Sequence, residues 1–267
     1  MSPSTTSSSS SGTAINTPTS STTSSTSTTP APAPTPSPAP APTPTPFIRP
    51  KLRLEIRDLA HPGATLFLTS ITPSTTLRSA TSSVLSLLYQ TPHNPTPTRS
   101  VTLVLRDKPG VAYTTGTELD SDHKEIHLSL GYVAGIKPAD RLSDEITGVV
   151  VHELVHCFQN DARGTCPGGL IEGVADWVRL NSELAAPPPH WKRDTSKGWD
   201  AGYDRTAYFL QYLEDVFGEG SVRRLNAKLG EGKYVEKSFW PELFGKSVAE
   251  LWEGYCEEVD GEKKALA

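Results

Sequence analysis

The stretch SDEITGVVVHELVHCFQN, residues 143–160, restricts the fold more than any other part of the chain. Ser143 is a residue type favoured as a helix N-cap, and Asp144 and Glu145 place acids in the first turn. A helix is therefore predicted from Ser143 to about Asn160. The motif H-E-x-x-H falls in the middle of this helix, at residues 152–156.

A helix gives this motif a chemical meaning. His152 and His156 are four residues apart, so they lie on the same face one turn apart, and both imidazoles can reach one metal ion. Glu153 lies about 100° round the helix, beside the ion without having to bind it. That position suits a general base that activates a zinc-bound water. Gly148, one turn earlier, leaves space at the site or serves helix packing.

A catalytic zinc usually keeps three protein ligands and one open position, so a third ligand is needed. The metzincin pattern would require glycine at 159 and histidine at 162, where the chain has Gln159 and Ala162. A gluzincin takes a glutamate from a following helix, and GGLIEGVAD, residues 168–176, offers Glu172. Asp176, one turn later, could accept the outer N–H of a ligand histidine. The alternative is that both acids belong to a solvated helix face.

The oxyanion of a tetrahedral intermediate needs a donor besides zinc. Tyr203 is the first candidate, because a phenol donates without carrying charge, and His190 is the second. Either side chain could instead serve packing. His123 and His127 lie too far apart along a strand to chelate one ion together, so a solvent-facing strand is predicted for them. Cys157 points away from the metal face and is predicted to be a buried thiol.

The rest of the folded part predicts strands first and helices second, which is an α+β arrangement. Its N-terminal part is expected to form a mixed sheet with one helix, and its C-terminal half, with the H-E-x-x-H helix, is expected to be mostly helical. The last of the four predicted strands is proposed as the sheet edge above the cleft, where an extended peptide could add. The strands are predicted at 52–57, 101–105, 111–115 and 125–130, and the further helices at 77–90, 170–180, 199–217, 222–229 and 247–259.

Residues 1–46 consist almost wholly of Ser, Thr, Pro and Ala, and are predicted to be disordered. The start of the chain shows neither the basic nor the apolar region of a signal peptide, and no run is apolar enough to span a bilayer. A net charge of -5 argues against nucleic-acid binding. The expected folded domain is 47–267, and the oligomeric state is left open.

Three segments together resemble the plant and fungal basic secretory protein family. They are HELVHCFQ at 152–159, PGGLIEGVADWVRL at 167–180 and WDAGYDRTAYFL at 199–210, and the similarity extends through Leu225-Asn226 and 244–246 to Leu251-Trp252. The resemblance implies a zincin-like fold and a gluzincin-type peptidase outside the cell, often linked with plant defence. It also implies His152, His156 and Glu172 as ligands and Glu153 as the catalytic acid/base. The chain departs from the family in being acidic.

The leading functional hypothesis is zinc-dependent hydrolysis of peptide bonds in a peptide or protein substrate. A second is a zincin-like wall or defence protein that binds polysaccharide or another protein without turnover, which Trp177, Trp191, Trp199 and the Ser/Thr/Pro-rich segment 1–46 would fit. A third is a zinc hydrolase that acts on non-peptide amides or esters. The intact Glu153 favours an enzyme, since a structural zinc site needs no adjacent base.

Overall fold

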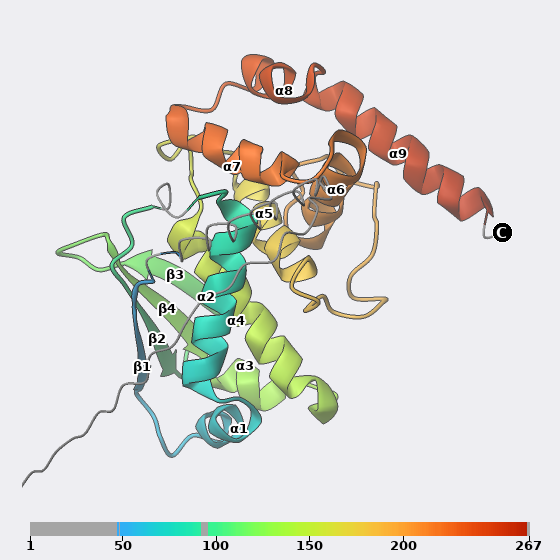
Figure 1. Cartoon of the computed structure of the whole chain (residues 1–267). Helices are drawn as coiled ribbons and strands as arrows, with labels where there is room; N and C mark the ends of the chain where they lie inside the picture. The colour runs from blue at the N-terminus through green and yellow to red at the C-terminus, as the bar shows by residue number, and fades with distance from the viewer. Residues whose placement is uncertain (1–46, 48, 92–95, 266–267) are drawn as a thin grey trace, which may run out of the picture. The chain divides into compact units, whose positions relative to one another are not determined.

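The computed structural model describes residues 47, 49–91 and 96–265, and the predicted disordered segment 1–46 lies outside this range. The architecture is the predicted α+β arrangement, with a four-stranded mixed sheet followed by a mostly helical C-terminal half (Figure 1). Within the described residues, the hydropathy of every helix is too low, or its length too short, for it to cross a membrane.

The sheet has the strand order β1-β2-β4-β3. Strands β1 (Lys51–Ile56), β2 (Ser100–Arg106) and β4 (His123–Ser129) run parallel, and β3 (Ala112–Gly116) is antiparallel to β4. All four predicted strands are therefore present, but the proposed edge strand is wrong. β4 is paired on both sides, and the two edges of the sheet are β1 and β3.

Side chains alternate between the two faces along each strand, and the face that carries the apolar ones is covered by helices. On β2 and β4, apolar side chains at every second position are fully buried and join the main core. Helices α2 (Pro73–Leu88) and α4 (Leu142–Phe158) pack on this face and on each other. The predicted solvent-facing position of His127 is wrong, because its ring stacks 4.6 Å from the ring of Tyr113 and only 4% of the residue is exposed.

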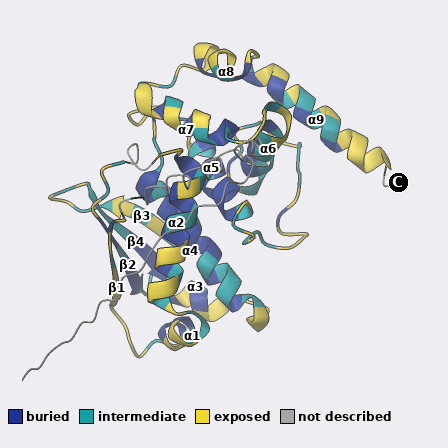
Figure 2. Cartoon of the chain, in the orientation of Figure 1, coloured by how far each residue is buried: buried dark blue, intermediate teal, exposed yellow. Residues whose placement is uncertain are grey.

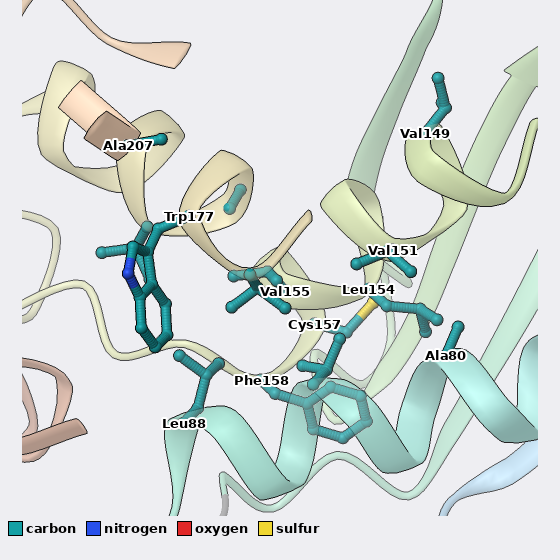
Figure 3. Close-up of a cluster of buried hydrophobic side chains, with 14 of the residues drawn as sticks. Ala80, Leu88, Val149, Val151, Leu154, Val155, Cys157, Phe158, Trp177 and Ala207 are labelled. Atoms are coloured by element: carbon teal, nitrogen blue, oxygen red, sulfur yellow. The ribbon is translucent and has the colours of Figure 1, made fainter. Parts of the chain in front are cut away.

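Helix α4 is the centre of the fold, because most of its residues are buried (Figure 2). Val151, Leu154, Val155 and Phe158 are buried against α2 and its neighbours (Figure 3). Burying such side chains contributes about 1.5–3 kcal/mol each. Cys157 is also buried, as predicted. The polar His152 and His156 thus stand on a helix whose orientation is fixed by packing on its other sides.

The C-terminal half consists of helices that pack in sequence beyond α4, as Figure 1 shows. The first two of these helices approach closely at Gly173, since a Cβ there would lie 2.2 Å from the side chain of Thr206 on the next helix. The helices are α5 (Gly168–Leu180), α6 (Tyr203–Phe217), α7 (Ser221–Glu231), α8 (Glu236–Phe244) and α9 (Val248–Ala265).

Several boundaries differ from prediction for local reasons. Ser143 lies inside α4, which begins at Leu142, so Ser143 is not the cap. The helix predicted from Trp199 begins only at Tyr203, because the Thr206 hydroxyl bonds the Trp199 carbonyl and Gly202 N–H in a turn. The short helices α1 (Pro62–Ser70) and α3 (Leu130–Gly135) and helix α8 were not predicted.

Candidate metal centre and cleft

Helices α4 and α5 bring three possible metal ligands together. The Nε2 atoms of His152 and His156 lie 3.2 Å apart, and Oε2 of Glu172 lies 3.1 Å from the first and 3.8 Å from the second. These residues form the one group of three or more His, Cys, Asp or Glu side chains with metal-binding spacing in the described part of the chain. Asp176 is only 3% exposed, so the two acids do not together form a solvated helix face.

The spacing of these atoms fits a single small divalent cation. Tetrahedral zinc bonds of 2.0–2.1 Å separate neighbouring ligand atoms by about 3.3 Å. The observed separations of 3.1, 3.2 and 3.8 Å bracket that value. The side chains are 12%, 17% and 31% exposed for His152, His156 and Glu172, so the open side of the group faces the solvent near Glu172.

Each histidine also has a partner on its outer nitrogen. Nδ1 of His152 donates to Oδ1 of Asp176 at 2.6 Å, which directs Nε2 toward Glu172. The side-chain amide of Gln159 lies 2.6 Å from Nδ1 of His156. An amide can turn by 180° to present its oxygen instead of its nitrogen, so Gln159 could accept the Nδ1 proton of a ligand histidine. Both imidazoles are thereby oriented with Nε2 inward.

The charges of the two histidines differ strongly. Burial lowers the pKa of His152, but hydrogen bonds to Asp176 and Glu172 outweigh burial and raise the pKa to about 9. Burial and the nearby positive charge of His152 lower the pKa of His156 to about 4. At neutral pH without metal, His152 is therefore protonated and positively charged between the carboxylates of Asp176 and Glu172, and His156 is neutral.

Glu153 lies beside the ligand group and is held by the edge strand. Its carboxylate Oε2 accepts a 2.6 Å hydrogen bond from the Thr114 hydroxyl of β3. The residue is 6% exposed, and burial raises the pKa of its carboxyl, while the Thr114 hydrogen bond and the charge of His152 act in the opposite direction. Glu153 is thus separate from the three possible ligands but lines the same cleft.

Tyr203 lies over the ligand group at the start of α6. Its ring stacks on His152 with a centroid distance of 6.0 Å and an interplanar angle of 12°. Its backbone has a φ of 50°, in the left-handed region that a tyrosine rarely adopts. The charge of Glu172, followed by burial, raises the pKa of the phenol, which therefore stays protonated at neutral pH. His190 lines the same cleft from the loop between α5 and α6.

A second pair of groups joins α4 and α5 two turns from the ligands. Nη2 of Arg179 donates to Oε2 of Glu145 at 2.8 Å, and Nε of Arg179 donates to the Leu184 carbonyl. The guanidinium lies 5.1 Å from the ring of Trp191. A Cβ at Gly148 would approach Nε of Arg179 to 2.5 Å, so this glycine accommodates Arg179 and not the metal group.

The candidate site lies in a cleft of about 1160 Å³. One wall is the edge strand β3, with Ala112, Tyr113 and Thr114 among the lining residues. The pairing of Val111 with Ser129 places the N–H and C=O groups of Ala112 and Thr114 on the outer edge of the sheet. This edge offers free backbone groups beside Glu153.

A family model described as "Peptidase of plants and bacteria" matches residues 49–255, which include the whole cleft. The chain belongs to this peptidase family. Searches of curated proteins and of solved structures gave no match. Family membership supports peptidase activity and a peptide or protein substrate.

In this member of the family, sequence reasoning named the three side chains that converge here, and Asp176 beside His152, but it missed Thr114 and Gln159. Thr114 gave no signal, because its contact with Glu153 joins residues 39 apart in sequence. Gln159 entered only as a departure from the metzincin pattern and as part of the family resemblance, with no role of its own. Arg179 is three residues after Asp176 on the same helix, and this spacing could have suggested a further contact with α4.

Proposed function

We propose that the chain is a zinc-dependent peptidase of the gluzincin type, with His152, His156 and Glu172 as ligands. The proposal rests on the convergence of these three side chains from α4 and α5 with the separations that a tetrahedral zinc requires. Two imidazoles and one carboxylate also suit zinc better than magnesium or calcium, which prefer oxygen ligands alone. A bound zinc would polarise the scissile carbonyl and acidify the attacking water.

The protein groups supply the proton transfers and the orientation. Glu153 accepts the proton of the attacking water and then passes it to the leaving amine. Asp176 and Gln159 hold the two imidazoles with Nε2 inward. The phenol of Tyr203, stacked on His152, is the first candidate donor to the oxyanion, and His190 is the second.

Peptide binding is proposed along the edge of β3. The outward N–H and C=O groups of Ala112 and Thr114 can pair with an extended substrate, as an added strand. Such a strand would lie beside Glu153, because Thr114 contacts the Glu153 carboxylate. The cleft volume of about 1160 Å³ accommodates several residues of an extended peptide.

The tryptophans cited for a non-catalytic binding protein do not form an exposed aromatic surface. Trp177 and Trp191 are 4% and 9% exposed, and Trp199 packs edge-to-face on Trp240 at 5.2 Å. This packing weakens the alternative of a wall or defence protein that binds without turnover.

The decisive experiment compares the wild-type protein with the Glu153→Gln variant. Both should contain about one zinc per chain by elemental analysis, since Glu153 is not a ligand in this proposal. The wild type should cleave labelled casein and a peptide library, and a chelator should abolish cleavage. The variant should lose cleavage. Full activity in the variant, or full activity in the metal-free wild type, would refute the proposal.

A further inference from the structure

The strand that forms the edge of the cleft also holds the candidate base. Thr114 is in the middle of β3, and its hydroxyl lies 2.6 Å from Oε2 and 3.0 Å from the backbone carbonyl oxygen of Glu153. A hydroxyl has one proton to donate, and a carboxylate is the stronger acceptor at the shorter distance. The hydroxyl therefore donates to Oε2.

The second carboxylate oxygen of Glu153 is in a different position. Oε1 has no hydrogen-bond partner among the described residues. In that part of the chain, the buried side-chain polar atoms without a partner are Nδ1 of His127 and Oη of Tyr255. Oε1 of Glu153 is not one of them, so it is accessible from the cleft that Glu153 lines. One carboxylate oxygen is held by Thr114, and the other is free of hydrogen bonds to the described residues.

We infer that Thr114 is a positioning residue that fixes the Glu153 carboxylate with Oε1 directed into the cleft. This inference rests on the proposed role of Glu153 as the base. A glutamate on a helix can rotate about three side-chain bonds, and the hydrogen bond from β3 restricts that rotation. The backbone N–H and C=O groups of Thr114 also lie on the free sheet edge. The strand that would bind the peptide is thus also the strand that orients the base. The peptide and the Glu153 carboxylate are therefore both placed relative to β3.

The test uses two substitutions at Thr114 and one matched control. Thr114→Val keeps the shape and removes the hydroxyl, whereas Thr114→Ser keeps the hydroxyl. Thr115→Val is the control, because Thr115 is on the same strand, its side chain points to the opposite sheet face, and its hydroxyl bonds only the Gly116 carbonyl. Each full-length protein is loaded with zinc, and its zinc content is measured first.

The kcat and KM for cleavage of labelled casein should distinguish loss of the Thr114 hydroxyl from a general change in the strand. In Thr114→Val, kcat should fall about 10- to 100-fold with little change in KM, because the base is misplaced while substrate binding is retained. Thr114→Ser should recover most of the loss, and Thr115→Val should match the wild type. An unchanged kcat in Thr114→Val, or equal losses in the Val and Ser variants, overturns the inference.

A second readout does not depend on turnover. Acetohydroxamic acid chelates zinc through two oxygens and gives its proton to a neighbouring carboxylate, so its affinity reports the placement of Glu153. Thr114→Val should bind it about 10-fold more weakly than the wild type and Thr114→Ser, at equal zinc content. Equal affinities in all three proteins overturn the inference. If casein is not cleaved by the wild type, the peptidase proposal fails, while this binding comparison still decides the role of Thr114.

Discussion

Nδ1 of His152 lies 2.6 Å from Oδ1 of Asp176, and Asp176 is 3% exposed. This contact between α4 and α5 determines which nitrogen of His152 faces the other ligand candidates. Because Asp176 is one turn after Glu172 on α5, the same helix supplies a possible ligand and the group that orients another. The geometry of the candidate metal centre therefore depends on a residue outside the three possible ligands.

The first prediction concerns this carboxylate. Asp176→Ala should lower zinc affinity about 10- to 100-fold, because Nδ1 of His152 loses its acceptor and the ring loses its fixed orientation. Competition with a fluorescent zinc chelator measures the effect. Asp200→Ala, at an exposed aspartate in the loop before α6, is the control and should bind zinc as the wild type does. Equal affinities for Asp176→Ala and wild type would contradict the prediction.

The second prediction follows from the charges of the metal-free site. His152, with its pKa raised to about 9, is protonated at pH 7, whereas His156, with its pKa lowered to about 4, is neutral. Zinc binding at pH 7 should therefore release about one proton, and affinity should rise about 10-fold per pH unit between pH 5 and 8. Calorimetry in buffers with different ionisation enthalpies counts the protons. Release of none, or of two, would show that the assignment of charge is wrong.

The third prediction separates the two oxyanion candidates. Tyr203→Phe should lower kcat about 100-fold and leave KM and zinc content nearly unchanged, since the phenol acts on charge that develops in the transition state. Tyr208→Phe, at a half-buried tyrosine of the same helix, should have little effect. His190→Ala is measured in parallel. A larger loss for His190→Ala than for Tyr203→Phe would exchange their roles.

The fourth prediction concerns the ion pair between α4 and α5. Arg179 and Glu145 are 9% and 19% exposed in their side chains. Arg179→Met should destabilise the metal-free protein by about 3 kcal/mol, because Glu145 is left as a poorly solvated charge. The double variant with Glu145→Gln should lose less than the sum of the two single variants. Urea unfolding measures the free energies, and strict additivity would contradict the coupling.

The fifth prediction uses Gly148, which packs against the same arginine. Alanine within a helix is normally about 1 kcal/mol more favourable than glycine. Gly148→Ala should nevertheless destabilise the wild type by about 1–3 kcal/mol, since its Cβ would lie 2.5 Å from Nε of Arg179. In the Arg179→Met background the same change should be neutral or stabilising. Destabilisation of equal size in both backgrounds would show that the contact with Arg179 is not the cause.

The local pattern of the sequence determined the secondary structure near the site and the identity of the candidate ligands. H-E-x-x-H places two imidazoles on one helix face whatever surrounds the helix, because four residues make about one turn. The alternation of apolar residues likewise predicted β1 and β4, and a short β-branched run predicted β2. Such inferences hold because they depend on residues close together in the chain.

Only the tertiary structure decided which strand borders the cleft and which groups support the site. The strand order β1-β2-β4-β3 places β3 at the edge, and no local pattern of β3 or β4 contains that order. The contacts of Glu153 with Thr114 and of Glu145 with Arg179 join residues 39 and 34 apart in sequence. Their partners are selected by the packing of α4 against the sheet and α5, which depends on the whole core and not on short-range spacing.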